Sequence, residues 1–246
     1  MRAPDCLTAR PVAHRGLHDA ARGVIENTPS SVAAAVAANY AIEVDLQITA
    51  DNQAMVYHDE TLGRLTEGSG RLDAMDAAAL RRVPFKGTDD RMMSLDELCE
   101  IVAGRVTLVL ELKSHFNGDG RLPLRVAGVL KKYAGPVAAM SFDPAQIAVL
   151  REAAPTLRRG LVAERRYRPH HQDRSWLRSS AGYLADLGRA NPQFLAYSVK
   201  DLSSPPPLIF RYLLGRPLLT WTVRSGDDRA RAARWADQMI FEGFRP

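Results

Sequence analysis

Several ionisable residues lie in one short stretch of the sequence, AIEVDLQITADNQAMVYHD, which spans residues 41–59. Glu43 and Asp45 are two positions apart, and His58 and Asp59 close the stretch. The apolar residues around them alternate as in β-strands, where residues two apart share a face. A charge on a buried strand is costly unless it is paired or binds a metal. The pattern therefore indicates a polar site built on strands.

Two further apolar segments end in ionisable residues. PVAHRG carries His14 and Arg15, and RVTLVLELK carries Glu111 and Lys113 on one face near its end. Barrel enzymes take their catalytic groups from the carboxyl-terminal ends of several strands. We therefore expect these side chains to meet the first group at one rim.

Three of these residues are carboxylates that could bind one metal ion: Glu43, Asp45 and Glu111. Carboxylate oxygens suit a hard divalent cation, so we predict Mg²⁺ or Ca²⁺, with Mn²⁺ as a further candidate. The sequence has no paired cysteines and no HExxH motif, which argues against zinc. The alternative is a network of ion pairs with Arg15 and Lys113, but these two cations leave one carboxylate unbalanced.

The histidines and the two cations suit work on a phosphate group. His14 and His58 can accept and donate protons near neutral pH, so they could form a base–acid pair. Arg15 can bind two phosphate oxygens through its planar fork, and Lys113 supplies a point charge. A single histidine is more often structural, but two beside a carboxylate cluster are harder to explain in that way.

Aromatic residues close two later apolar segments, Phe142 in SFDP and Trp221 in LTWTV. Most aromatic residues on strands belong to a core. These two could instead line the rim of the barrel and contact the apolar side of a substrate.

The other four histidines carry less information. His18 and His115 follow strand-like segments, and His170 and His171 belong to a basic cluster at 158–171. We expect all four to be exposed to solvent.

The elements that must position these residues alternate between strand and helix. Thr28 and Pro29, for example, have the types of an N-cap and a first helical residue. Such alternation is typical of parallel βα units. The strand-like segments are 11–16, 41–49, 54–59, 105–113, 136–142, 158–164, 194–200, 217–223 and 238–244.

These nine segments exceed by one the eight parallel strands of a (β/α)8 TIM barrel. Only residues 50–53 separate Thr49 from Ala54, whereas a parallel connection needs about a dozen residues. The third segment is therefore predicted to return antiparallel, as a hairpin strand added after the second strand of an α/β barrel. If Thr49 pairs with Ala54, Asp45 lies opposite His58.

Composition bounds the class of protein. The 246 residues are 46% hydrophobic and 25% charged, and no linker divides them, so we expect one domain over 1–246. No segment has the roughly 18 consecutive apolar residues of a transmembrane helix, and no apolar leader precedes the first strand. Cys6 and Cys99 show no disulfide or metal spacing, which suits a reducing compartment, and we expect a cytoplasmic protein.

The formal charge of +5 leaves several anionic partners to consider. Basic clusters lie at 158–171 and 229–235, but no zinc finger or RNP motif accompanies them. We expect no nucleic-acid partner and interpret the clusters as solvated surfaces. The segment PPPLIFRYLLGRP at 205–217 could contact lipid peripherally, although a barrel helix is the alternative. No feature indicates an oligomeric state.

Several short motifs occur together in a fixed order. They are HRG (14–16), ENT (26–28), EVDLQIT (43–49), HDETLGRLTEGSG (58–70), ELK (111–113), SF (141–142) and WTV (221–223). In this order and spacing, the sequence resembles the glycerophosphodiester phosphodiesterase family. The resemblance implies a (β/α)8 barrel with a small insertion at about 60–104.

The resemblance also implies a function and its residues. Members cleave small-molecule glycerophosphodiesters to sn-glycerol 3-phosphate and an alcohol. It implies a divalent metal held by the three carboxylates named above, His14 and His58 as general base and acid, and Arg15 and Lys113 on the phosphate. Two alternatives stay open. One is a phospholipase D-like activity on lysolipids, and the other is a phosphodiester-binding module without catalysis.

The sequence departs from the family pattern in two places. Ile25 stands where proline usually precedes ENT, and the last strand reads MIFEGF where relatives commonly have a pattern like GIITD. The second difference could alter the rim, and Glu242 is a candidate substitute for the missing aspartate.

Overall fold

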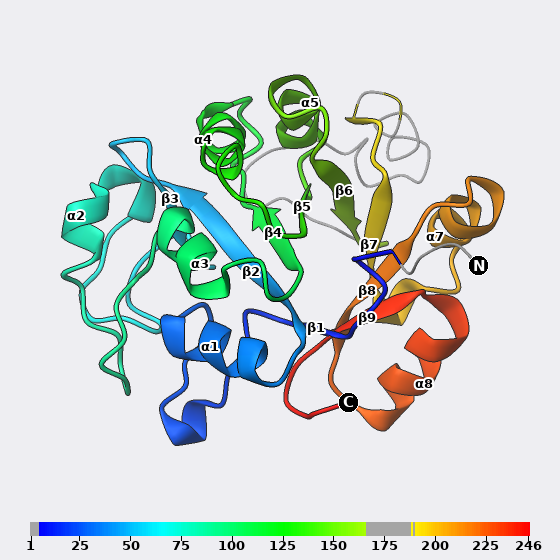
Figure 1. The fold of residues 1–246 in the computed structure, drawn as a ribbon, viewed down its shortest axis with the longest axis horizontal. Helices are drawn as coiled ribbons and strands as arrows, with labels where there is room; N and C mark the ends of the chain where they lie inside the picture. Colours follow the sequence, from blue (N-terminus) through cyan, green and yellow to red (C-terminus); the bar gives the residue numbers. More distant parts are fainter. Residues whose placement is uncertain (1–4, 166–187, 189) are drawn as a thin grey trace.

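The structure is a computed structural model that describes residues 5–165, 188 and 190–246. Its strands form one sheet in the order β1-β9-β8-β7-β6-β5-β4-β2-β3, and β1 also pairs with β2, so the sheet closes into a barrel (Figure 1). All pairings are parallel except that of β2 with β3. The predicted (β/α)8 barrel with an added antiparallel strand is confirmed. The strands are β1 (Val12–Ala13), β2 (Ala41–Ile48), β3 (Ala54–Val56), β4 (Leu108–Leu112), β5 (Val137–Ser141), β6 (Arg158–Ala163), β7 (Phe194–Ser198), β8 (Leu218–Val223) and β9 (Gln238–Phe241).

Helices surround this sheet on its outer side (Figure 1). Their starts follow the sequence signals: the Thr28 side chain accepts a hydrogen bond from Ser31 N, and Ser94 and Glu97 form a reciprocal capping box. The helices are α1 (Pro29–Ala37), α2 (Ala77–Leu80), α3 (Leu95–Val102), α4 (Arg121–Leu130), α5 (Pro144–Ala153), α7 (Pro205–Leu208) and α8 (Gly226–Trp235), with 3₁₀ turns at Ala20–Arg22, Leu72–Ala74 and Val199–Asp201.

The segment at 205–217 forms α7 and a π-helical turn over Ile209–Leu213, in the connection between β7 and β8. Phe210 is buried, whereas the tip of the turn exposes Tyr212 and Leu213. Of the two interpretations of this segment, the structure therefore agrees with a helix of the barrel.

The inside of the barrel is filled with apolar side chains, so it is a core and not a pore. These side chains are Val12, Ala41, Val109, Ala138, Met140, Val162, Phe194, Ala196, Leu219 and Ile240. Phe194 lies so close to Gly160 that a side chain at Gly160 would overlap its ring. Chemistry is therefore confined to the rim beyond this layer.

The hairpin differs from its predicted register by one residue. Leu46 pairs with Val56 and Ile48 with Ala54, so Tyr57 lies opposite Asp45 and donates to its carbonyl at 3.0 Å. The prediction that His58 lies opposite Asp45 in the hairpin register is wrong by one residue. The turn is one residue shorter than we expected, because Asn52 adopts a left-handed φ of 60° and Thr49 N donates to Gln53 O.

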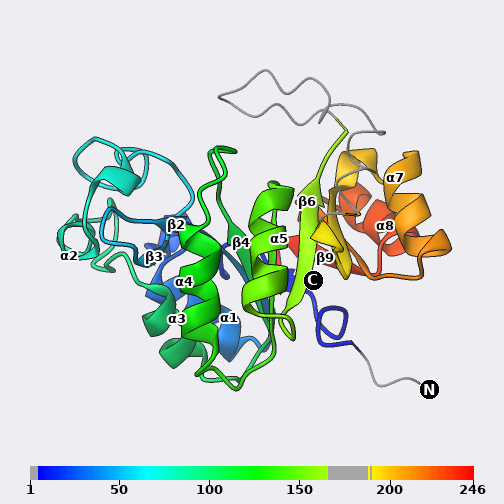
Figure 2. The same cartoon turned by 90° about the horizontal axis from the view of Figure 1, so that it is seen from above.

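A small lobe follows β3 and packs around a core of its own. It holds α2, which lies on one side of the barrel while α7 lies on the other (Figure 2). α3, whose residues lie within the 60–104 segment, packs against α1 and α4 in the helix ring. The core of the lobe consists of Ile25, Met55, Tyr57, Leu62, Leu72, Ala77, Leu80, Phe85 and Met92.

Candidate active site

Three carboxylates meet at the rim because they continue the inward face of two neighbouring strands. On β2 the inward residues run from the apolar Ala41 to Glu43 and Asp45, and on β4 they run from Val109 to Glu111. The parallel register places Asp45 directly beside Glu111. All three carboxylates are buried, and their oxygens offer ligand atoms within 4.8 Å of one another. The predicted convergence is present.

Asp45 is balanced by cations and an amide. Lys113 Nζ lies 2.8 Å from Asp45 Oδ1, Arg15 Nε lies 3.2 Å from Oδ2, and Asn27 Nδ2 donates to Oδ2 at 2.8 Å. Burial alone would raise the pKa of Asp45, but the charges of Lys113 and Arg15 outweigh it and hold that pKa far below its usual range. These two cations therefore favour the ionised form of Asp45.

Glu43 is left without such balance. Its Oε2 accepts a hydrogen bond from Arg15 N at 3.0 Å, while the buried Oε1 has no partner among the described residues. Burial raises the pKa of Glu43 strongly, and the charges of Asp45 and Glu111 raise it further. An ion-pair network of the cations alone thus leaves a buried carboxylate unsatisfied. A divalent cation bound by the three carboxylates would fit this donor set.

The HRG and ENT motifs hold each other in place. Gly16 has a φ of 81°, and a side chain there would overlap Ser31. Asn27 N donates to the carbonyl of Arg15 at 2.9 Å, and Arg15 Nη1 donates to Glu26 Oε1 at 2.8 Å. The first motif therefore keeps its guanidinium over the carboxylates.

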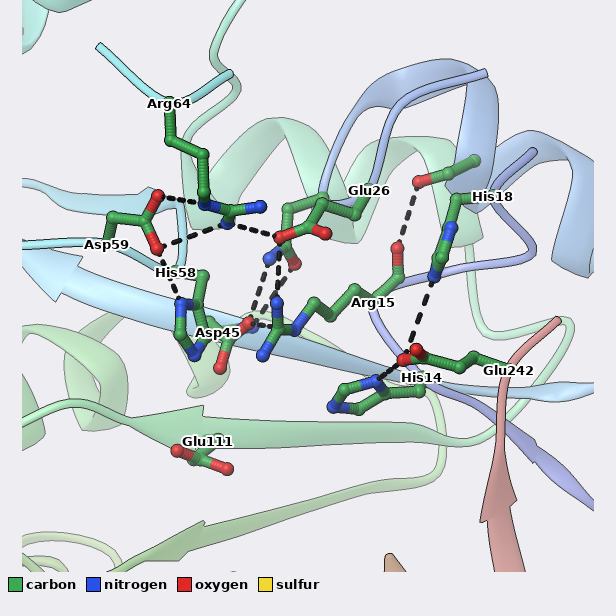
Figure 3. Close-up of polar contacts among 12 residues, drawn as sticks. His14, Arg15, His18, Glu26, Asp45, His58, Asp59, Arg64, Glu111 and Glu242 are labelled. Atoms are coloured by element: carbon green, nitrogen blue, oxygen red, sulfur yellow. Dashed lines mark hydrogen bonds and ion pairs between the residues drawn. The ribbon is translucent and has the colours of Figure 1, made fainter. Parts of the chain in front are cut away.

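His14 follows β1, and its side chain contacts a carboxylate. Its Nδ1 is hydrogen-bonded to Glu242 Oε2 (Figure 3). Its Nε2 lies 3.9 Å from Glu43 Oε2. Glu242 follows β9 and accepts a second hydrogen bond from Arg224 Nε at 2.6 Å. Burial raises the pKa of Glu242, but the hydrogen bonds from His14 and Arg224 outweigh it and lower that pKa to about 2.

His58 follows β3 and has a similar support. Its Nδ1 lies 2.7 Å from Asp59 Oδ1, and Arg64 binds both Asp59 and Glu26 (Figure 3). Gln47 Nε2 also donates to the His58 carbonyl at 3.0 Å. Burial lowers the pKa of the His58 imidazole, and the charge of Asp45 offsets only part of that effect. In both histidines the carboxylate engages Nδ1 and leaves Nε2 for other groups.

Two cavities open beside these groups. The first has a volume of about 260 Å³ and the second about 730 Å³. Phe142 and Trp221, whose rings meet edge to face with centroids 5.5 Å apart, lie between them. The residues that line both cavities are His58, Glu111, Lys113, Phe142 and Trp221. His14, Arg15 and Glu43 line the first cavity. Every site residue named from the sequence thus lies at a cavity or, as Asp45, directly beneath one.

Two of the remaining histidines contradict the sequence-based expectation of exposure. His18 Nε2 is buried 4.0 Å from Glu242, and burial lowers the His18 pKa. His115 is partly buried between Glu60 and Asp73, at 3.4 and 3.2 Å. Loops over a barrel rim fold back on the rim, which explains both cases. His170 and His171 lie outside the described residues.

The basic clusters behave differently from each other. Arg229 and Arg231 on α8 are exposed, as a solvated surface requires. At the start of the other cluster, however, Arg159 is buried on β6 and Arg158 pairs with Asp5.

Several supporting residues received no role from the sequence. Glu26 and Asn27 lie in the ENT motif, which was the only signal for them. Arg64 likewise had only the motif at 58–70 as a signal, whereas Arg224 had none, because Glu242 becomes its neighbour only in the folded chain.

The model of the glycerophosphoryl diester phosphodiesterase family matches residues 14–244. The chain belongs to this family. The match includes every candidate site residue, from His14 to Glu242.

Two curated relatives and one solved structure of this kind are similar to the chain. A glycerophosphodiester phosphodiesterase of Caldanaerobacter subterraneus is 29% identical over 163 residues, which is 61% of this chain and 65% of that protein. Glycerophosphodiester phosphodiesterase 1 of Rattus norvegicus is 34% identical over 116 residues, or 42% of this chain and 34% of its own length. The chain thus covers less than two thirds of either relative.

The solved structure is that of an Oleispira antarctica phosphodiesterase in complex with the product sn-glycerol-3-phosphate. It covers 96% of this chain and 94% of its own, with a TM-score of 0.79 and 19% identity. At that identity the likeness concerns the fold. In the described part of this chain, no helix has the length and apolarity to cross a membrane.

Proposed function

We propose that the protein hydrolyses glycerophosphodiesters to sn-glycerol 3-phosphate and an alcohol. The observation that carries this proposal is the pair of histidines at one cavity, each with Nδ1 on a carboxylate, beside Arg15 and Lys113. Family membership and the product in the Oleispira antarctica structure support the choice of substrate.

We infer that a divalent cation, Mg²⁺ or Ca²⁺ with Mn²⁺ as an alternative, binds to Glu43, Asp45 and Glu111. The unpartnered Oε1 of Glu43 supports this inference, because a buried carboxylate oxygen without a donor is costly. When bound, the cation would neutralise phosphate charge during phosphoryl transfer.

The other site residues then act on the phosphate and on protons. Arg15 and Lys113 bind phosphate oxygens at the mouth of the carboxylate cluster. His14 accepts at Nε2 a proton from the attacking water, whose oxygen forms the new bond to phosphorus, while Glu242 stabilises the resulting imidazolium at Nδ1. His58 donates a proton from Nε2 to the departing alcohol, and Asp59 supports its charged form. Phe142 and Trp221 contact the apolar parts of the substrate.

An assay with glycerophosphocholine tests the proposal directly. Purified protein with Mg²⁺ or Ca²⁺ is expected to release sn-glycerol 3-phosphate and choline in equal amounts. Turnover no higher than that of His14→Ala would refute the proposal. If glycerophosphocholine binds measurably but is not cleaved with any of the three metals, the protein is a binding module.

The lysolipid alternative makes a different demand on the cavities. A lysophospholipid carries an acyl chain on its glycerol, so that side of the substrate would need the larger, aromatic-lined cavity. Side-by-side assays of choline release from glycerophosphocholine and lysophosphatidylcholine separate the two activities. We expect the first substrate to be preferred.

A further inference from the structure

The two cavities at the rim differ in their outer walls. The second cavity is the larger, and Leu112 and Phe116 contribute apolar surface to its wall. The outer wall of the first cavity is instead charged, with Glu164, Lys200 and Arg224 contributed by three successive strand ends. A small polar group fits the first cavity, and groups of varied size and polarity fit the second.

Glu164 is the carboxylate of this outer wall. It follows β6 directly and is half-buried at the first cavity, which Glu43 and Glu111 also line. Burial and the charge of Asp201 raise the Glu164 pKa, whereas the charge of Lys200 lowers it. Arg224 donates to Glu242, whereas the charge of Lys200 acts on Glu164.

We propose that the first cavity binds the glycerol part of the substrate, and that Glu164 determines specificity for it by accepting hydrogen bonds from its hydroxyl groups. This assignment rests on the proposed function. Lys200 donates to the same hydroxyl groups, and the departing alcohol occupies the second cavity. His14 lines the first cavity, and His58 lines both, so His58 can reach an alcohol in the second.

The size of the first cavity agrees with this orientation. Its volume of about 260 Å³ is sufficient for a three-carbon diol and a phosphate. A diol needs acceptors as well as donors, and Glu164 supplies a carboxylate acceptor in addition to the hydroxyl groups of Ser198 and Thr222.

The test compares substrates with and without glycerol. For Glu164→Ala and Glu164→Gln, kcat/KM for glycerophosphocholine is expected to fall about 10- to 100-fold, as for loss of hydrogen bonds to a charged acceptor. For bis(p-nitrophenyl) phosphate, which has no glycerol, kcat/KM of both variants should stay within about two-fold of the parent value. An equal loss with both substrates, or no loss with either, overturns the proposal.

A binding measurement makes the result independent of turnover. Calorimetry is expected to show that Glu164→Ala weakens sn-glycerol 3-phosphate about ten-fold and leaves methyl phosphate unchanged. Equal effects on the two ligands, including none, contradict the assignment. Glu152→Gln, an exposed change on α5, is the matched control for a lost carboxylate. If the parent protein cleaves bis(p-nitrophenyl) phosphate but not glycerophosphocholine, the proposed function fails instead, and the binding comparison still decides the role of Glu164.

Discussion

On each side of the candidate active site, a carboxylate and an arginine support a histidine. The two sides differ in where these supporting residues come from in the fold. On one side, His14 contacts Glu242, which Arg224 holds, and these residues follow β1, β9 and β8. On the other side, His58 contacts the adjacent Asp59, and Arg64 from the small lobe holds that carboxylate. The first support needs barrel closure, whereas most of the second is local in sequence.

This difference shows which contacts tolerate movement. Strand ends around a closed barrel fix Glu242 against His14 from both sides, and Glu242 N also donates to Val223 O at 3.1 Å. The Asp59 carboxylate instead depends on a loop and on an arginine whose side chain is half exposed. We therefore expect the barrel-based support to be the more rigid of the two.

The largest loss of activity should come from substitution of the candidate metal ligands, because the reaction steps assigned to both histidines would depend on the same metal ion. Glu43→Gln is expected to abolish activity and to remove the rise in melting temperature that Mg²⁺ or Ca²⁺ gives the parent protein, because binding to the folded state stabilises it. Thermal melts with and without each metal measure this without an assay of turnover. Retained stabilisation by metal in Glu43→Gln would show that the carboxylates do not bind it.

Removal of either imidazole should come next. His14→Ala and His58→Ala are each expected to lower kcat by about a hundred- to ten-thousand-fold, as for loss of general acid–base catalysis, with metal-dependent stabilisation retained. Steady-state kinetics and thermal melts on the same preparations provide both readouts. Full activity of either variant would remove that histidine from the proposed mechanism.

Replacement of the two supporting carboxylates compares the two sides directly. Glu242→Gln and Asp59→Asn should each reduce kcat by about 10- to 100-fold, since the imidazolium loses a charged partner. Glu242→Asp is expected to recover part of the loss only if its shorter side chain still reaches His14 Nδ1. If Glu242→Gln keeps full kcat, the contact has no role in positioning His14.

The outer arginines should matter least. Arg224→Ala and Arg64→Ala remove partly exposed ion pairs, which contribute about 0–1 kcal/mol, so kcat should change by less than about ten-fold. Arg64→Ala should have the larger effect, because Arg64 also ties Asp59 to Glu26. Equal effects would argue that the lobe is as rigid as the barrel.

The pH dependence of stability sharpens the same contrast. The Glu242 pKa falls from 4.5 to about 2 in the folded protein, so its carboxylate stabilises the fold above pH 4.5, and this contribution is lost as the pH falls towards 2. The difference in melting temperature between the parent protein and Glu242→Gln should therefore shrink over that interval. A constant difference would show that Glu242 stays equally protonated in the folded and unfolded states.

The sequence predicted the barrel and the carboxylate cluster because both follow from local rules. Residues two apart on a strand share a face, and a four-residue gap cannot connect parallel strands, so Glu43 and Asp45 were placed correctly. The hairpin register was wrong by one because the backbone of Asn52, not the gap length, determines the turn. The role of Arg224, the contact of Arg64 with Glu26 and the burial of His18 depend on loop packing, which no local pattern encodes.

The role of Glu242 could be predicted only in part from the sequence. The altered motif of the last strand indicated that it could replace an aspartate, but only the pairing of β9 with β1 shows that it reaches His14. Residues 228 positions apart meet there, and no periodicity extends over such a separation.

The pairing of β1 with β9 also affects how the protein becomes functional during folding. An intermediate with most of its helices formed, but with these two edges still apart, would lack the anion beside the first imidazole. Enzyme assays during refolding should therefore lag behind circular dichroism. The recovery of turnover would then follow the closure of the barrel by β1 and β9, and not the formation of secondary structure.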